Sequence, residues 1–282
     1  MSNYHLSDRM AAVAGLVPAG VTACDIGCDH GFVAIHLVEA GVCPGMIAMD
    51  INKGPLLRAK EHIESAGLST YIDTRLSDGL EAFEAGEAEC MIAAGMGGRL
   101  IVKILSDYPE KVKSLRYLVL QPQSELSFVR GCLRRQGFVI RKEDMILEDG
   151  KFYPMMLVET ETCGEGSGKN PERNGQTSRK KATGAEHESS RCDPGEDPGA
   201  ASDRRAAYRE SLEDEFGPCL IRDNHPVLLQ YLDWWEGQQN KILREVLAYP
   251  ERRRQVEEEI DRIRDVRGMM KEKVVQENGG YV

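Results

Sequence analysis

The chain has 282 residues, which is enough for one domain of ordinary size and a smaller second one. Its formal net charge of -10 argues against a protein that coats nucleic acid non-specifically, although it leaves room for a local basic surface. No apolar run approaches the ~20 residues of a membrane span, and we expect no signal peptide. The eight cysteines form no C-x-x-C pair, so we expect neither a metal site nor a disulfide framework, and we expect a cytoplasmic location.

Strands and helices are predicted to alternate through the first 160 residues, after a first helix at 5–17. The predicted strands are 21–26, 46–51, 72–76, 89–94 and 115–121. The predicted helices are 32–40, 55–66, 99–108 and 125–136. Two further runs, 138–145 and 151–159, flank Asp149-Gly150, a dipeptide typical of a β-hairpin turn. This order predicts an α/β fold with a parallel sheet, helices on both faces, and a terminal antiparallel hairpin.

The composition changes after residue 160. Residues 161–205 are rich in Gly, Ser, Glu, Lys and Asn and nearly free of large apolar side chains, so we expect a disordered linker or insertion. From 206 onward, two apolar stripes at helical spacing are separated by Pro250 and predict a helical hairpin. We therefore expect three parts: a domain at 1–160, a linker at 161–205 and a helical domain at 206–282.

The first strand leads into the segment Asp25–Gly31, which reads D-x-G-x-x-x-G. Glycines at a strand-to-helix turn let the backbone approach a ligand, and Asp50 at the tip of the second strand is placed to accept hydrogen bonds from a ribose. A dinucleotide fingerprint would begin with Gly, not with Asp25. S-adenosylmethionine (SAM) carries an amino group and a sulfonium but no phosphate, so a carboxylate beside Gly27 suits it. The pair of motifs predicts a SAM site.

Three more turns are predicted to face the same SAM site, because ligands of open parallel sheets bind beyond the carboxyl ends of the strands. Asp78-Gly79 could accept the amino group of an adenine ring, or be an ordinary loop. Gly95-Met96-Gly97-Gly98 would let backbone amides reach a ligand, where a simple helix start needs only one Gly. Gln121-Pro122-Gln123 could read the edge of a base, or form a Pro-containing turn.

Asp29 and His30, just past the glycine turn, are candidates for orienting the methyl acceptor, with helix N-terminal packing as the alternative for His30. Two sets of arginines are candidates for phosphate contact. One comprises Arg130, Arg134 and Arg135, and the other comprises Arg252, Arg253, Arg254, Arg262, Arg264 and Arg267. Interleaved Glu and Asp residues make a solvated charged face the default interpretation of the second set.

Taken in order, these motifs resemble those of the bacterial tRNA (adenine-22, N1)-methyltransferases, the TrmK family. The matching segments are L-S-D-R-M (6–10), D-I-G-C-D-H-G (25–31), A-M-D-I-N-K-G-P-L-L-R-A-K (48–60), S-D-G-L (77–80), A-G-M-G-G (94–98) and L-Q-P-Q (120–123). The resemblance covers residues 4–160 well and 206–282 loosely. It implies a Rossmann-like SAM domain followed by a coiled-coil-like domain that helps to grip tRNA. The chain departs from the family in its longer polar segment 161–205 and in Cys28, where a small residue such as Ser is expected.

The sequence thus predicts a SAM-dependent enzyme that methylates N1 of adenine 22 in tRNA. No D/N-P-P-Y/F motif follows the fourth strand, which argues against methylation of an exocyclic amino group. The alternatives are a methyltransferase for a small molecule or a protein, and a non-catalytic RNA-binding protein that retains SAM. The oligomeric state stays open.

The predicted site residues fall into three groups. The predicted catalytic residues are Asp29 and His30. The predicted cofactor residues are Asp25, Gly27, Gly31, Asp50, Ile51, Asp78, Gly79, Gly95, Met96 and Gly97. The predicted substrate residues are Gly98, Gln121, Pro122, Gln123, Arg252, Arg253 and Arg254.

Overall fold

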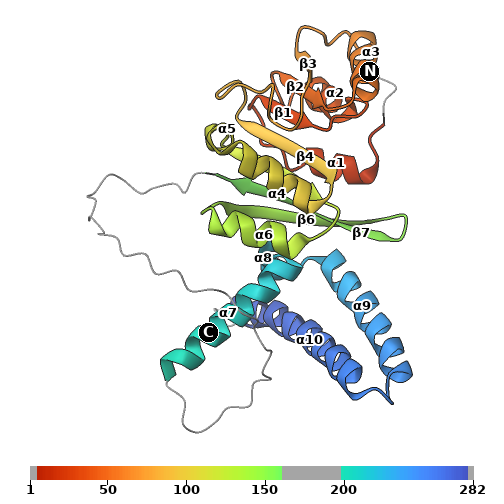
Figure 1. Ribbon diagram of the computed structural model, residues 1–282, viewed down its shortest axis with the longest axis vertical. Helices are drawn as coiled ribbons and strands as arrows, with labels where there is room; N and C mark the ends of the chain where they lie inside the picture. The colour runs from red at the N-terminus through yellow and green to blue at the C-terminus, as the bar shows by residue number, and fades with distance from the viewer. Residues whose placement is uncertain (1–4, 161–197, 279–282) are drawn as a thin grey trace, which may run out of the picture. The chain divides into compact units, whose positions relative to one another are not determined.

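A seven-stranded sheet with the order β3-β2-β1-β4-β5-β7-β6 forms the centre of the first 160 residues (Figure 1). Its strands are β1 (Ala23–Ile26), β2 (Met46–Asp50), β3 (Ile72–Leu76), β4 (Cys90–Met96), β5 (Tyr117–Pro122), β6 (Val139–Glu148) and β7 (Lys151–Glu159). The first five strands are parallel, whereas β7 is antiparallel to both β5 and β6. The predicted Rossmann-like sheet with a terminal hairpin is therefore confirmed. The computed structural model describes residues 5–160 and 198–278, with side chains at 5–160 and 202–271.

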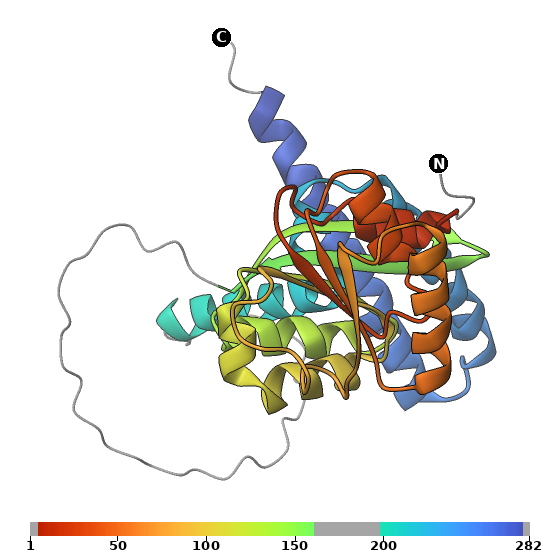
Figure 2. The ribbon, with the colours of Figure 1, turned by 90° about the horizontal axis from the view of Figure 1, so that it is seen from above.

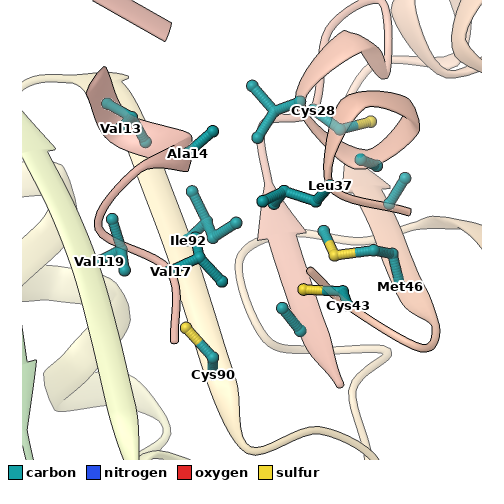
Figure 3. Close-up of a cluster of buried hydrophobic side chains, with 14 of the residues drawn as sticks. Val13, Ala14, Val17, Cys28, Leu37, Cys43, Met46, Cys90, Ile92 and Val119 are labelled. Carbon is teal, nitrogen blue, oxygen red and sulfur yellow. The ribbon is translucent and has the colours of Figure 1, made fainter. Parts of the chain in front are cut away.

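Helices cover both faces of the sheet, as the alternating pattern predicted (Figure 2). One face carries α1 (Asp8–Ala14), α2 (Phe32–Glu39) and α3 (Lys53–Ser65), and the other carries α4 (Gly98–Asp107), α5 (Pro109–Ser114) and α6 (Leu126–Arg135). The six-residue α5 was not predicted. In the core of the first face, Val17 lies close to Ile92 and Val119 (Figure 3).

The first helix is shorter than predicted. Ser7 caps α1 by accepting a hydrogen bond from the Met10 amide (3.3 Å), and the helix ends at Ala14, with Gly15 as its C-cap. Leu16 and Val17 continue the apolar pattern as a buried turn, so periodicity alone placed the end of the helix too late.

The hairpin turn is as predicted. Asp149 and Gly150 have φ angles of 50° and 72°, and two left-handed residues are what a two-residue turn of type I′ requires.

Four helices follow in the C-terminal part: α7 (Pro198–Phe216), α8 (Pro218–Arg222), α9 (Pro226–Glu245) and α10 (Pro250–Asn278). The predicted hairpin corresponds to α9 and α10, which pack against each other. The predicted linker ended too late, because residues 198–205 are helical; the rest of it, 161–197, lies outside the described residues. Among the described residues, 5–160 and 211–278 belong to one compact unit, and 198–210 are assigned to a second.

Within the larger unit, β6 joins the sheet to the C-terminal helices through a buried ion pair. Arg130 Nε of α6 donates to Glu143 Oε1 of β6 at 2.8 Å, and both side chains are essentially inaccessible. Glu143 Oε2 accepts from the backbone amides of Cys219 (2.8 Å) and Leu220 (3.3 Å). An apolar cluster that includes Met145 of β6 surrounds these contacts. Arg130 is thus a structural residue, and its predicted phosphate contact is wrong.

Candidate cofactor and methyl-transfer site

The turns predicted to hold the ligand lie at one edge of the sheet, beyond the carboxyl ends of β1 to β5 (Figure 1). The turn after β1 is fastened to β2, because the amides of Gly27 and Cys28 both donate to the carbonyl of Met49, at 2.8 and 3.0 Å. Gly27 and Gly31 have φ angles of 74° and 72°, a region that favours glycine. A Cβ on Gly31 would also stand 3.1 Å from the Cβ of Ala59 in α3.

Asp50 is buried at the end of β2, where its carboxylate accepts from the amides of Asn52 (2.7 Å to Oδ1) and Asp29 (3.3 Å to Oδ2). A carboxylate has about four lone-pair positions, so acceptor capacity remains for two hydroxyl groups. This donor set fits the ribose of a nucleoside. Ile51, the next residue, is 59% exposed and offers an apolar surface beside it.

Asp25 lies buried in β1 next to Asp50. Burial, followed by the charge of Asp50, raises the pKa of Asp25 to about 7. A cationic ligand group would stabilise the ionised form of this carboxyl, and the amino group of SAM is such a group. Burial, followed by the charges of Asp25 and Asp50, also raises the pKa of the Cys28 thiol, which disfavours its nucleophilic thiolate form.

The turn after β3 is held by Ser77, whose hydroxyl donates to the Gly79 carbonyl (2.9 Å) and accepts from the Ala82 amide (3.0 Å). Gly79 has a φ of 57°, and a Cβ there would meet Ile104 at 3.0 Å. Asp78 is exposed at this turn, which leaves its side chain accessible to a ligand.

Strand β4 bulges at Gly95, one residue before its carboxyl end, and this residue has a φ of 75°. The Gly95 amide donates to Gln121 Oε1 at 3.0 Å, and the same oxygen accepts from Arg9 Nη1 at 3.2 Å. Gln121 is fully buried, and its side chain holds the backbone at Gly95. A buried side chain cannot contact a base directly, so this arrangement does not support the predicted base contact of Gln121. Pro122 is also buried, whereas Gln123 is exposed.

The three remaining glycine-turn residues have different surroundings. Met96 reaches toward the first turn, because a Cβ on Gly27 would lie 2.6 Å from its Cε. Gly97 is exposed at the N-cap of α4. Gly98 is buried, and a Cβ there would stand 2.4 Å from the Ser124 carbonyl oxygen. Close packing accounts for the glycine at position 98. The predicted substrate contact of Gly98 therefore has no support from its surroundings.

The two predicted catalytic residues lie together at the surface beside the first turn. Asp29 is in the left-handed region (φ 47°), and its carboxylate lies 3.6 Å from His30 Nε2 and 3.9 Å from Arg58 Nη2. The His30 ring stacks on Phe32 and His62, at centroid distances of 5.4 and 5.6 Å. This stacking favours the packing role for His30. Asp29 keeps an exposed carboxylate at the edge of the site.

The C-terminal arginines mostly bond to side chains of their own helix. Arg253 and Arg254 donate to the glutamates four residues on, at 2.8 and 2.9 Å, and Arg252 donates to Gln255 at 3.0 Å. These contacts agree with the solvated charged face. A hollow between α9 and α10 is lined in part by Arg252 and Trp235, but it contains none of the predicted cofactor residues.

The sequence reasoning did not single out Arg9, which contacts Gln121 beside the Gly95 bulge, although L-S-D-R-M contains it. Besides Gln121 it contacts the hairpin, because its backbone amide donates to Glu148 Oε1 (3.0 Å) and its guanidinium lies 4.9 Å from the centre of the Tyr153 ring. These contacts join residues more than 100 positions apart, and local sequence patterns carry no signal for them.

Among residues 5–160 and 198–278, no group of three His, Cys, Asp or Glu is arranged to hold a metal ion. The absence of a metal in the working enzyme stays a prediction. In the same residues, no helix is both long and apolar enough to span a membrane.

The chain is similar to known methyltransferases. A family model described as "Methyltransferase domain" matches residues 6–156. The tRNA (adenine(22)-N(1))-methyltransferase of Bacillus subtilis is 36% identical over 159 residues, which is 56% of this chain and 67% of that protein.

Solved structures extend the likeness to the C-terminal part. The B. subtilis m1A22 tRNA methyltransferase TrmK has a TM-score of 0.68 at 26% identity, covering 93% of this chain and 98% of that one. A Streptococcus pneumoniae protein solved in complex with SAM has a TM-score of 0.69 at 27% identity, covering 93% and 99%. By these matches, the chain belongs to the methyltransferases and, within them, to the tRNA (adenine(22)-N(1))-methyltransferase family.

Proposed function

We propose that this chain transfers the methyl group of SAM to N1 of adenine 22 in tRNA, with residues 1–160 holding the cofactor and residues 206–282 contacting the RNA. The observation that carries the cofactor assignment is Asp50, a buried carboxylate with spare acceptor capacity beside the buried Asp25. The relatives support tRNA as the substrate, since the B. subtilis protein is a tRNA (adenine(22)-N(1))-methyltransferase. A tRNA substrate also supports a cytoplasmic location. Small-molecule and protein substrates are not favoured.

Methyl transfer to N1 requires the enzyme mainly to position the two reactants. When bound, SAM supplies an electrophilic methyl group on its sulfonium sulfur. N1 of adenine has an in-plane lone pair, so this chain need not remove a proton before the transfer, and holding the two reactants in line is the main contribution. Because the methylated base is a cation, an exposed carboxylate such as Asp29 can stabilise the developing charge.

The N1 position also dictates how the RNA must be presented. N1 lies on the Watson–Crick edge of adenine, so the base has to leave its pair or stack before it can enter the site. The exposed residues around the Gly95 turn, including Gln123, form the surface that such a base meets first.

The decisive experiment incubates the protein with radiolabelled SAM and unmodified tRNA, and identifies the modified nucleoside. The matched control is the same tRNA with guanine in place of adenine 22. We expect 1-methyladenosine in the first tRNA and no label in the second. Equal labelling of both, or labelling of neither, would exclude the proposed target.

Asp29→Ala separates catalysis from cofactor binding. We expect unchanged SAM affinity with lower turnover at saturating tRNA, because the side chain lies at the edge of the site and contacts no buried group of the cofactor turn. A parallel fall in SAM affinity and turnover would make Asp29 a cofactor residue.

A further inference from the structure

An exposed apolar rim borders the methyl-transfer site. The helices α4 and α6 begin directly after β4 and β5, so their first turns lie at the same edge of the sheet as the Gly95 turn. Leu100 in α4 and Phe128 in α6 are 46% and 42% exposed there. Both side chains are therefore accessible to a molecule that approaches this edge of the sheet.

A cation is paired with the aromatic ring of this rim. The Arg99 guanidinium lies over Phe128, 5.6 Å from the ring centroid, and the Arg99 side chain is 78% exposed. Arg99 Nε donates to Glu125, and a guanidinium has further N–H donors that a phosphate can accept. An aromatic ring that stays 42% exposed and a solvent-facing guanidinium over it offer partners for the two parts of a nucleotide, its base and its phosphate.

The rim is rigidly built. Glu125 is a non-glycine residue in the left-handed region (φ 56°), and its carboxylate accepts from the Arg99 amide at 3.2 Å. The Gly98 amide donates to Ser124 Oγ at 3.3 Å, and no room is left for a Cβ on Gly98. These contacts join the start of α4 to the start of α6, the helix that carries Phe128.

We propose that Phe128 stacks on a tRNA base next to the target adenine, and that Arg99 binds a neighbouring phosphate. The inference rests on the proposed function and deepens it. An adenine that leaves its stack exposes the faces of the neighbouring bases, and an aromatic ring at the rim of the site can cover one of them. Stacking on a ring tolerates any base, so this contact would hold the RNA without reading its sequence.

The test compares Phe128→Ala with Tyr71→Ala. Tyr71 is a 55% exposed aromatic residue next to the start of β3, at the opposite edge of the sheet, and serves as the matched control. We expect Phe128→Ala to weaken tRNA binding roughly 5- to 150-fold, the range that one stacked base contributes, with SAM affinity unchanged. Phe128→Trp should retain the affinity, because it retains a flat ring.

Arg99→Ala adds a readout that a purely structural role would not produce. Loss of one phosphate contact should reduce the slope of log K against log salt concentration by about 1, whereas Phe128→Ala should leave the slope unchanged. If Phe128→Ala bound and methylated tRNA as the Tyr71→Ala control does, the stacking contact would be absent.

Two other outcomes would also overturn the inference. A fall in SAM affinity in Phe128→Ala would mean that the ring supports the fold. Dissociation of an oligomer by this variant, with unchanged tRNA affinity, would mean that the rim contacts a second copy of the chain. Failure of the proposed function is distinguishable, because the unmodified protein would then methylate no tRNA.

Discussion

The Arg130–Glu143 pair offers a sharp test of how the C-terminal helices are anchored. Arg130→Met keeps an apolar stem like that of arginine but removes the guanidinium and its charge. The inaccessible carboxyl of Glu143 would then lose its cationic partner and keep only the amides of Cys219 and Leu220, and the carbonyls of Asp214 and Glu215 would lose the Arg130 Nη1 donor at 2.9 and 3.0 Å. Removing one partner of a buried pair costs about 3–5 kcal/mol. We expect a loss of that size in the free energy of unfolding.

Urea denaturation followed by circular dichroism measures this loss. Arg134→Met is the matched control on the same helix, because Arg134 is 44% exposed where it pairs with Asp214, and such pairs contribute about 1 kcal/mol or less. The double variant Arg130→Met/Glu143→Gln should recover part of the stability, since it keeps an acceptor for the two amides but leaves no buried charge. A loss below about 1 kcal/mol in Arg130→Met, or a double variant no more stable than the single one, would refute the reasoning.

Three further predictions concern the site. Asp50→Ala should weaken SAM binding by about 1–3 kcal/mol through lost hydrogen bonds to a charged group, and unchanged affinity of a folded variant in calorimetry would remove Asp50 from the site. Gly98→Ala should destabilise the fold by about 1–3 kcal/mol, because its Cβ would stand 2.4 Å from a backbone oxygen. Gly97→Ala should not, because its nearest neighbour, the Ser124 hydroxyl, would lie at an ordinary contact distance of 3.6 Å. Equal melting temperatures of the two variants would contradict this. Asp25 has a pKa raised from 3.8 to about 7 in the folded chain. Between these two pH values the folded state therefore binds more protons than the unfolded state. The contribution of Asp25 to the free energy of unfolding consequently falls as the pH rises through that window. Asp25→Asn should flatten this part of the curve of stability against pH, and a variant curve parallel to that of the unmodified chain would show that another group is responsible.

Much of the fold was predictable because local patterns determine it. Strand β3 has the predicted bounds, Ile72–Leu76, and the Asp149-Gly150 turn follows from two residues that tolerate positive φ. The spacing from Gly27 to Asp50 indicated the cofactor turn, since both lie at strand ends. The i,i+4 pairs of Arg253 and Arg254 were also visible as alternating charges.

Contacts between distant segments were not predictable in this way. The burial of Gln121 depends on Arg9, 112 residues earlier, and on the bulge at Gly95. Arg130 and Arg134 share one helix and one residue type, yet only Arg130 meets a carboxylate that is shielded from water. Periodicity predicts the side of a helix that faces the core, but it does not predict which side chains that side will contact.

The position of β7 has a consequence for the order in which the nascent chain can fold. Since β7 follows β6 in the chain but lies between β5 and β6, the ribosome must release residue 159 before β5 can be covered. Until then the free edge of β5, Tyr117-Leu118-Val119-Leu120, is an apolar strand open to pairing with another chain. The hairpin must add to the sheet as a unit, and only then does Glu143 stand where α8 can attach. Translation that stalls inside β7 would therefore leave an aggregation-prone intermediate of the kind that chaperones bind.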